Sequence, residues 1–201
     1  NIIDGTIPST ITIVVDDANS DNDFDGVADQ TVSATTADND TAGFTIVQSG
    51  GSTAVAETGT TDTFTVVLTA QPASNVVISI SSSDSGEATV SGSLTFTAAN
   101  WNTPQTVTIT GVDDVTVDGA QTSTVTVSII DAISDNDFDG VADQTVSVST
   151  ADNDTAGFTV TESGGSTSVD ESGTTDTFTV VLDAQPTSNV VLTVTSSDTG
   201  E

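Results

Sequence analysis

The sequence predicts an all-β protein built from tandem Greek-key β-sandwich domains of immunoglobulin-like architecture. Thr and Val alternate in short runs that Gly, Asn, Asp and Pro separate, and no run has helical periodicity. The segment DNDFDGVADQ starts at Asp21 and again at Asp135, and TADNDTAGFT starts at Thr36 and again at Thr150, so both recur at an offset of 114 residues. A period of this length is the size of one sandwich domain and is too long for a solenoid coil.

The recurring segment ADNDTAG precedes a new strand run each time and divides the chain. We predict a complete β-sandwich repeat at 42–155, the C-terminal part of a preceding repeat at 1–41, and the N-terminal part of a following repeat at 156–201. The chain has no second copy of 88–114, which indicates a longer array. Alternatively, the two partial domains complete each other between chains, as in donor-strand assembly.

Within the complete repeat, each alternating run between turn residues predicts one strand. In order, these are 43–48, 61–69, 75–82, 87–91, 93–98, 105–111, 122–130 and 144–149. The run from Gln105 shows the pattern, since Val107 and Ile109 share one face and the threonines share the other. Trp101 is the only tryptophan and lies in the loop AANWNTP, where we expect it to cover an edge of the core.

The charge of the chain excludes several classes of function. It has 30 acidic residues and no Lys, Arg, His or Cys, for a net charge of −30. Nucleic-acid binding and contact with anionic membranes need a cationic surface, and no apolar run is long enough for membrane insertion. Most catalytic chemistry also needs residue types that this chain lacks, so we expect no enzyme. Unrelieved repulsion among the carboxylates predicts that the folded protein binds cations.

The strongest local motif is DNDFDGVAD, which occurs twice. Its carboxylates stand at loop positions 1, 3, 5 and 9 with Gly at position 6, the spacing by which a short loop wraps Ca²⁺, and the carbonyl of position 7 adds an oxygen. Position 12 is Val where an EF-hand has Glu, and a solvated acidic turn is the alternative. The expected ligands are Asp21, Asp23, Asp25, Val27 and Asp29 in one copy, and Asp135, Asp137, Asp139, Val141 and Asp143 in the other.

A second acidic set lies at the domain junctions. Asp38 and Asp40 flank Asn39 in one copy, and Asp152 and Asp154 flank Asn153 in the other. Together with acids from loops at the same end of the domain, each pair can form a cation site that stiffens the joint between domains. The alternative is a polar linker.

Several features in order resemble Calx-beta repeats across nearly all of 42–155. They are a Glu soon after the first strand, SGSLTFTAANW followed by TVTITGVDD, and a closing DND. The resemblance implies that acids gathered at one end of the sandwich bind calcium, with Asp118 where that family usually has Glu. By position, the implied ligands are Glu57, Asp113, Asp114, Asp118, Asp152 and Asp154. The DNDFDG segment is additional to the usual domain.

Comparable repeats occur in giant bacterial surface proteins, including calcium-dependent adhesins and their extender regions. The resemblance therefore implies a calcium-stiffened spacer or filament repeat on the cell surface, where external calcium can fill weak sites. The expected partners are neighbouring repeats of the same chain, and other copies where chains form a fibre. The alternatives are a sandwich that binds carbohydrate, ice or a partner protein through its Thr rows, and a carboxylate-pair hydrolase around Glu57 or Glu87.

Overall fold

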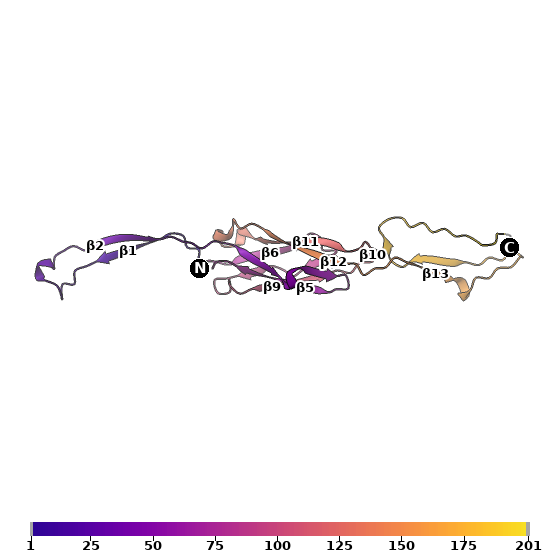
Figure 1. Cartoon of the computed structure of the whole chain (residues 1–201), viewed down its shortest axis with the longest axis horizontal. Helices are drawn as coiled ribbons and strands as arrows, with labels where there is room; N and C mark the ends of the chain where they lie inside the picture. The colour runs from indigo at the N-terminus through magenta and orange to yellow at the C-terminus, as the bar shows by residue number, and fades with distance from the viewer. Residues whose placement is uncertain (1, 200–201) are drawn as a thin grey trace.

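Two β-sheets pack against each other in the middle of an elongated chain, with a hairpin on one side and a second, smaller strand assembly on the other (Figure 1). The computed structural model describes residues 2–199, so Asn1 and the last two residues of the predicted third segment lie outside the described residues. The all-β sandwich predicted from the sequence is confirmed by this strand arrangement.

Each sheet combines strands that are distant in the sequence. The first sheet has the order β3 (Phe44–Gln48), β5 (Thr61–Leu68), β9 (Gln105–Gly111) and β7 (Ala88–Val90). The second has the order β4 (Thr53–Ala56), β12 (Gln144–Ala151), β11 (Gln121–Ile129), β6 (Val76–Ser82) and β8 (Leu94–Phe96). All neighbours are antiparallel except β4 and β12, which are parallel. The predicted strand runs match these strands closely, but the sequence did not predict β4.

The short strand β4 exists because the chain crosses from one sheet to the other after β3. The 3-10 turn η2 (Ser49–Gly51) makes this crossing, with Gly50 and Gly51 at φ 65° and 83°. Residues other than Gly rarely adopt such positive φ angles, so the two glycines permit the turn. The crossing brings β4 beside β12, in register from Thr53 opposite Val148 to Ala56 opposite Ala151.

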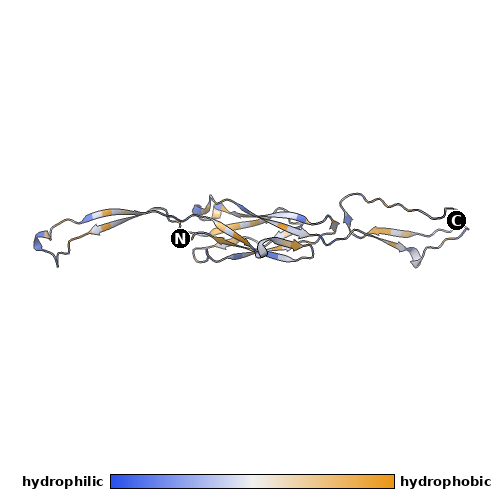
Figure 2. Cartoon of the chain, viewed as in Figure 1, coloured by the Kyte–Doolittle hydropathy of each residue, from blue (hydrophilic) through white to orange (hydrophobic). Residues whose placement is uncertain are grey.

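The core is formed by the inward-facing residues of both sheets. Val107 and Ile109 are fully buried and Thr106 is exposed, as the alternation predicted. Figure 2 shows apolar segments concentrated along the strands of the central sandwich. Trp101 is partly buried and packs against the core, which confirms its expected covering role. The largest fully buried side chains are Phe64, Phe96, Phe138, Ile78 and Ile109.

The flanking segments repeat the local structure of the centre without its burial. The hairpin of β1 (Ile7–Ile13) and β2 (Gln30–Thr36) corresponds, 114 residues earlier, to β11 and β12. The pair β13 (Phe158–Glu162) and β14 (Phe178–Leu182) corresponds to β3 and β5. Ile11 and Ile13 are 53% and 57% exposed, whereas their counterparts Val125 and Val127 are fully buried. The flanks therefore present open apolar faces that are closed in the central repeat.

The remaining elements are short. The 3-10 turns are η1 (Asn22–Phe24), η3 (Asp131–Ile133), η4 (Asn136–Phe138) and η5 (Ser163–Gly165). Two further strands, β10 (Thr116–Val117) and β15 (Gln185–Pro186), pair with each other in parallel. Neither was predicted from the sequence. Among residues 2–199, no helix is long and apolar enough to cross a membrane.

Candidate metal centre

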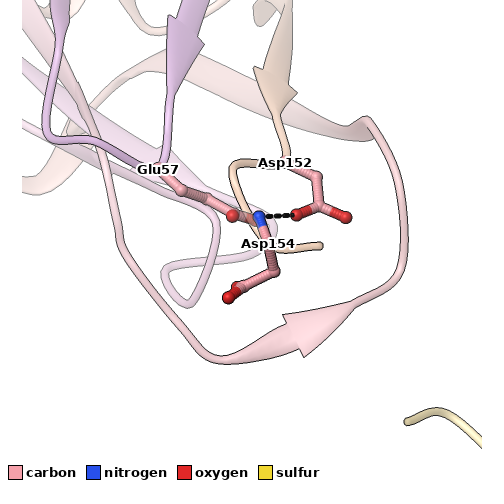
Figure 3. A group of neighbouring side chains, drawn as sticks. All are labelled: Glu57, Asp152 and Asp154. Carbon is pink, nitrogen blue, oxygen red and sulfur yellow. Dashed lines mark hydrogen bonds between the residues drawn. The ribbon is translucent and has the colours of Figure 1, made fainter. Parts of the chain in front are cut away.

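Acidic residues from five loops meet at the end of the sandwich that faces the C-terminal segment. Carboxylate oxygens of Glu57, Asp152 and Asp154 lie within 4.8 Å of one another, and so do those of Glu57, Glu87 and Asp114. Glu57 belongs to both groups, so the two groups adjoin. Figure 3 shows Glu57, Asp152 and Asp154 converging from the ends of β4 and β12.

Strand pairing explains why residues so distant in sequence converge. Because β4 and β12 are parallel and end in register, Glu57 and Asp152 leave the sheet at the same end, and the Glu57 N–H donates to Ala151 O at 3.1 Å. In the other sheet, the Val112 N–H donates to Glu87 O at 2.9 Å, which places Glu87 beside the residues that follow β9. Acidic residues from both sheets therefore lie together at this end of the sandwich.

Gly111 permits the two sheets to approach at this end. A Cβ atom on residue 111 would lie 2.1 Å from the backbone oxygen of Ala56, directly before Glu57. A contact this short with backbone cannot be relieved by a side-chain rotation, so any other residue would push β4 away from β9. The glycine in the motif TVTITG therefore supports the position of Glu57.

Several carboxylate oxygens at this end are buried without a hydrogen-bond partner. The side chain of Glu57 is 1% exposed and that of Glu87 is 9% exposed. The buried unpaired oxygens of the group are Glu57 Oε1, Glu87 Oε2, Asp118 Oδ1 and Asp154 Oδ2. A buried charge without a partner is costly, and the chain contains no Lys, Arg or His to supply one. The arrangement fits a bound cation.

Other oxygens of the same cluster are held by backbone amides. Asp152 Oδ1 accepts from the Asp154 N–H at 2.6 Å, and Asp152 Oδ2 accepts from the N–H groups of Asp118 and Gly119 at 3.1 and 2.7 Å. Glu57 Oε2 accepts from the Asn153 N–H at 3.0 Å. These bonds fix the loops, so that the unpaired oxygens are already positioned.

Burial and mutual repulsion disfavour the charged form of three carboxylates of the cluster, those of Glu57, Glu87 and Asp154. The Asn153 N–H lowers the pKa of Glu57, but burial and the charges of Asp152, Asp114 and Asp118 outweigh it and raise the pKa. Burial, followed by the charges of Asp118, Glu57 and Asp114, raises the pKa of Glu87. Burial and the charge of Asp152 raise the pKa of Asp154. By contrast, the N–H groups of Asp154 and Gly119 lower the pKa of Asp152.

The structure thus brings together most of the acids that the resemblance implied. Asp114 is half-buried and also accepts from the Thr116 N–H at 2.6 Å. Asp113 is exposed at the rim, where it accepts from Asn153 Nδ2 at 2.8 Å. Glu87 was not among the expected ligands. Its signal in the sequence is that SSDSGE, which ends at Glu87 directly before β7, recurs as SSDTGE 114 residues later. Only the strand pairing shows that Glu87 lies beside Glu57.

At the first junction, one half of the same arrangement recurs. Asp38 accepts from the N–H groups of Asp4, Gly5 and Asp40 at 3.0, 2.9 and 2.8 Å, as Asp152 does from their counterparts 114 residues later. Among the described residues, neither Asp38 nor Asp40 lies in a group of three acids close enough for one ion. The Asp38 and Asp40 site stays a prediction.

In the second copy of the DNDFDG loop, the first carboxylate accepts hydrogen bonds from backbone amides. Asp135 is buried, and its carboxylate accepts from the N–H groups of Ser74 and Asp137 at 2.6 and 3.1 Å. Phe138 is fully buried in the core, whereas Asp137, Asp139 and Asp143 are exposed. Val141 is partly buried against the core. Asp135 therefore anchors the loop, and Phe138 occupies its inward position.

In the first copy, Asp21 caps η1 through the Asp23 N–H at 2.9 Å, while Asp23, Asp25, Val27 and Asp29 are exposed. Within the described residues, no acid of either loop belongs to a close group of three. Calcium binding by these loops stays a prediction from their spacing alone.

Glu57 of the cluster also lines a surface hollow of about 660 Å³, together with Val112, Asp113, Asn153 and neighbouring Thr and Gly residues. None of the lining residues is aromatic, basic or a thiol. Carboxylates and backbone oxygens are the ligands that hard cations prefer, so the chemistry that this arrangement supports is cation binding.

Comparisons with known proteins leave the family open. No protein-family model and no curated protein matches the chain. Among solved structures, SSP-19, an MSP-domain protein like family member from Caenorhabditis elegans, is 19% identical over 52% of this chain and 96% of that chain, with a TM-score of 0.34. Domains 1–6 of the surface layer protein SbsC are 18% identical over 79% of this chain and 25% of that chain, with a TM-score of 0.41.

Domains 4 and 5 of the S-layer protein SbsC are 19% identical over 63% of this chain and 54% of that chain, with a TM-score of 0.36. This chain therefore spans about half of the two-domain structure and a quarter of the six-domain structure. Likenesses at this level carry no conclusion about function, and the fold class rests on the strand arrangement described above.

Proposed function

We propose that the chain is a calcium-stabilised structural repeat of an extracellular surface protein and acts as a spacer or fibre segment. The observation that carries this proposal is the cluster of Glu57, Glu87, Asp114, Asp118, Asp152 and Asp154. Four of its buried carboxylate oxygens lack hydrogen-bond partners, and the chain has no cationic residue. An external cation is therefore needed to offset the repulsion.

Calcium suits this cluster better than magnesium. Calcium accepts about six to eight oxygens in irregular geometry, whereas magnesium requires a near-ideal octahedron and keeps several waters. Two adjoining groups that share Glu57 supply many carboxylate oxygens from loops of different strands. Sites of this kind on extracellular modules have affinities near millimolar calcium, which only the outside of a cell supplies.

The structural role is supported by repetition and shape. A spacer needs copies of one rigid unit, and the 114-residue period supplies nearly identical units. The described residues form an extended particle in which the sandwich and its flanks follow one another along the long axis (Figure 1). The resemblance to Calx-beta repeats of bacterial adhesins supports this role and a location on the cell surface.

Calcium binding measured by titration calorimetry tests the proposal. We expect the double variant Glu57→Gln, Glu87→Gln to lose at least about tenfold in affinity, since one pair of unit charges 4 Å apart contributes about 4 kcal/mol at an effective dielectric constant of 20. The variant should remain folded because it removes repulsion between buried acids.

The matched control is Glu162→Gln, Glu171→Gln, which makes the same chemical change at exposed positions outside every expected calcium site. We expect its calcium isotherm to match that of the unmodified chain. Unchanged binding in the Glu57 and Glu87 variant, or an equal loss of affinity in the control, would contradict the proposal.

A further inference from the structure

The contact between successive repeats occurs twice in the chain, at positions 114 residues apart. At the second junction, Thr116 and Val117 of β10 pair in parallel with Gln185 and Pro186 of β15, and the Gln185 N–H donates to Val115 O at 2.7 Å. At the first junction, Ile2 forms a parallel bridge with Gln71. Ile2 and Gln71 are the counterparts of Thr116 and Gln185, so both junctions have the same register.

The same loop also inserts an apolar side chain into the neighbouring repeat. We call residues 116–120 and their N-terminal counterparts 2–6 the joint loop. Ile3 is partly buried and packs against the core of the central sandwich. Its counterpart Val117 lines a hollow of about 520 Å³ in the C-terminal segment, together with Phe158, Leu182 and Pro186.

We call Ala42, Phe44, Leu68 and Ala70, at the start of the central sandwich, its base, and the 114-residue correspondence with the hollow around Val117 assigns Ile3 to this surface. These are the counterparts of Ala156, Phe158, Leu182 and Ala184, which line the hollow around Val117. In the central repeat, Phe44, Leu68 and Ala70 are 4%, 3% and 1% exposed. In the central repeat, whose sandwich is complete, the base is therefore buried, and the preceding joint loop lies against it.

Each joint loop is also held by its own repeat. Asp4 and Gly5 donate their N–H groups to Asp38, and Asp118 and Gly119 donate theirs to Asp152. Gly5 and Gly119 have φ 65° and 73°, so the backbone turns in the same way at both junctions. The loop is thus fixed at one end by its own repeat and docked at the other on the next.

We infer that the base of each sandwich is a docking surface for the joint loop of the preceding repeat, and that this contact sets the direction of one repeat relative to the next. The occupant is the preceding repeat of the same chain, recognised by one apolar side chain, Ile3 or Val117, and by a parallel β-bridge beside it. The inference rests on the array role proposed above but not on the metal, because the docking contacts are apolar and backbone contacts.

Distances between repeats in saturating calcium test this inference. The chain has no cysteine, so Thr12→Cys in β1 and Thr106→Cys in β9, both exposed, accept a pair of spin labels at defined places. We expect a narrow distance distribution for the chain with native Ile3. Ile3→Asp should broaden it severalfold, because a carboxylate would have to be buried at the base.

The matched control is Ile7→Asp in the same segment, which changes the same residue type at a 45% exposed position and should leave the distribution narrow. At the second junction, Gln185→Pro removes the N–H that bonds Val115 O and should broaden the distances between labels at Thr106→Cys and Thr161→Cys. A cooperative unfolding transition in each variant establishes that the sandwich remains folded.

The two proposals fail in different ways. If Ile3→Asp and Gln185→Pro leave the distributions as narrow as in the unmodified chain, the docking surface is wrong, whatever calcium does. If the distributions broaden and the calcium isotherm keeps its wild-type affinity, the docking inference is supported. If the unmodified chain does not bind calcium, the proposed metal function fails while the distance comparison still decides the docking.

Discussion

Phe138→Ala is expected to lower the free energy of unfolding of the central sandwich by about 3 to 5 kcal/mol. Phe138 is fully buried, and the loop that carries it is tied to the segment just before β6 by the hydrogen bonds of Asp135 to Ser74 and Asn75. Truncation would remove apolar contacts and leave a cavity that the two sheets cannot close. Denaturant unfolding followed by Trp101 fluorescence measures the change, since Trp101 is the only tryptophan.

Phe24→Ala supplies the matched control for this substitution. Phe24 stands 114 residues before Phe138 in the same motif, but it is 57% exposed. We expect its replacement to change the unfolding free energy of the central sandwich by less than about 0.5 kcal/mol. Equal losses in both variants, or no loss in Phe138→Ala, would contradict the role of DNDFDG as a loop that closes the core.

In the presence of a chelator, acidification from pH 7 toward pH 5 is expected to stabilise the protein. Glu57, Glu87 and Asp154 have raised pKa values, so the folded state binds more protons than the unfolded state in this range. Stability then increases as the pH falls through the raised values toward the ordinary value of 4.5 for Glu. Relief of the general repulsion among the acids acts in the same direction.

Below that range the sign reverses, because Asp135 and Asp152 have lowered pKa values and their bonds to backbone amides are lost when they take up protons. Melting temperatures across pH 3 to 7 therefore pass through a maximum in chelator. Saturating calcium should remove the increase between pH 7 and 5, since the cation occupies the place of the protons. The Glu57→Gln, Glu87→Gln variant distinguishes the contribution of the cluster from that of the general charge. Its melting temperature in chelator should increase less between pH 7 and 5 than that of the unmodified chain.

Most of the fold could be predicted from local sequence because the strands carry a clear alternation. Val107 and Ile109 alternate with threonines in the sequence and are buried in the structure. The strands β4 and β10 could not be predicted, since each is short and depends on a partner brought from far along the chain. In β4, the parallel pairing with β12 decides the conformation of a four-residue segment.

The candidate site was only partly predictable for a related reason. Spacing along the chain emphasised the DNDFDG loops, in which the inward position is taken by Phe138. Glu87 was missed as a candidate ligand because its closeness to Glu57 arises from the packing of two sheets, which no local pattern records. Asp152 and Asp154 were found because the motif DND recurs at each junction.

Thermal unfolding with calcium at about a hundredfold its dissociation constant and with excess chelator, at equal ionic strength, tests the central claim most directly. A ligand present at a hundredfold its dissociation constant stabilises the folded state by about 2.7 kcal/mol, which for a domain of this size raises the melting temperature by about 10 °C or more. We expect such a rise with calcium and a smaller one with magnesium. Equal melting temperatures in calcium and chelator would contradict the account. The folded state would then be as stable without a cation beside the buried carboxylates of Glu57 and Glu87 as with one.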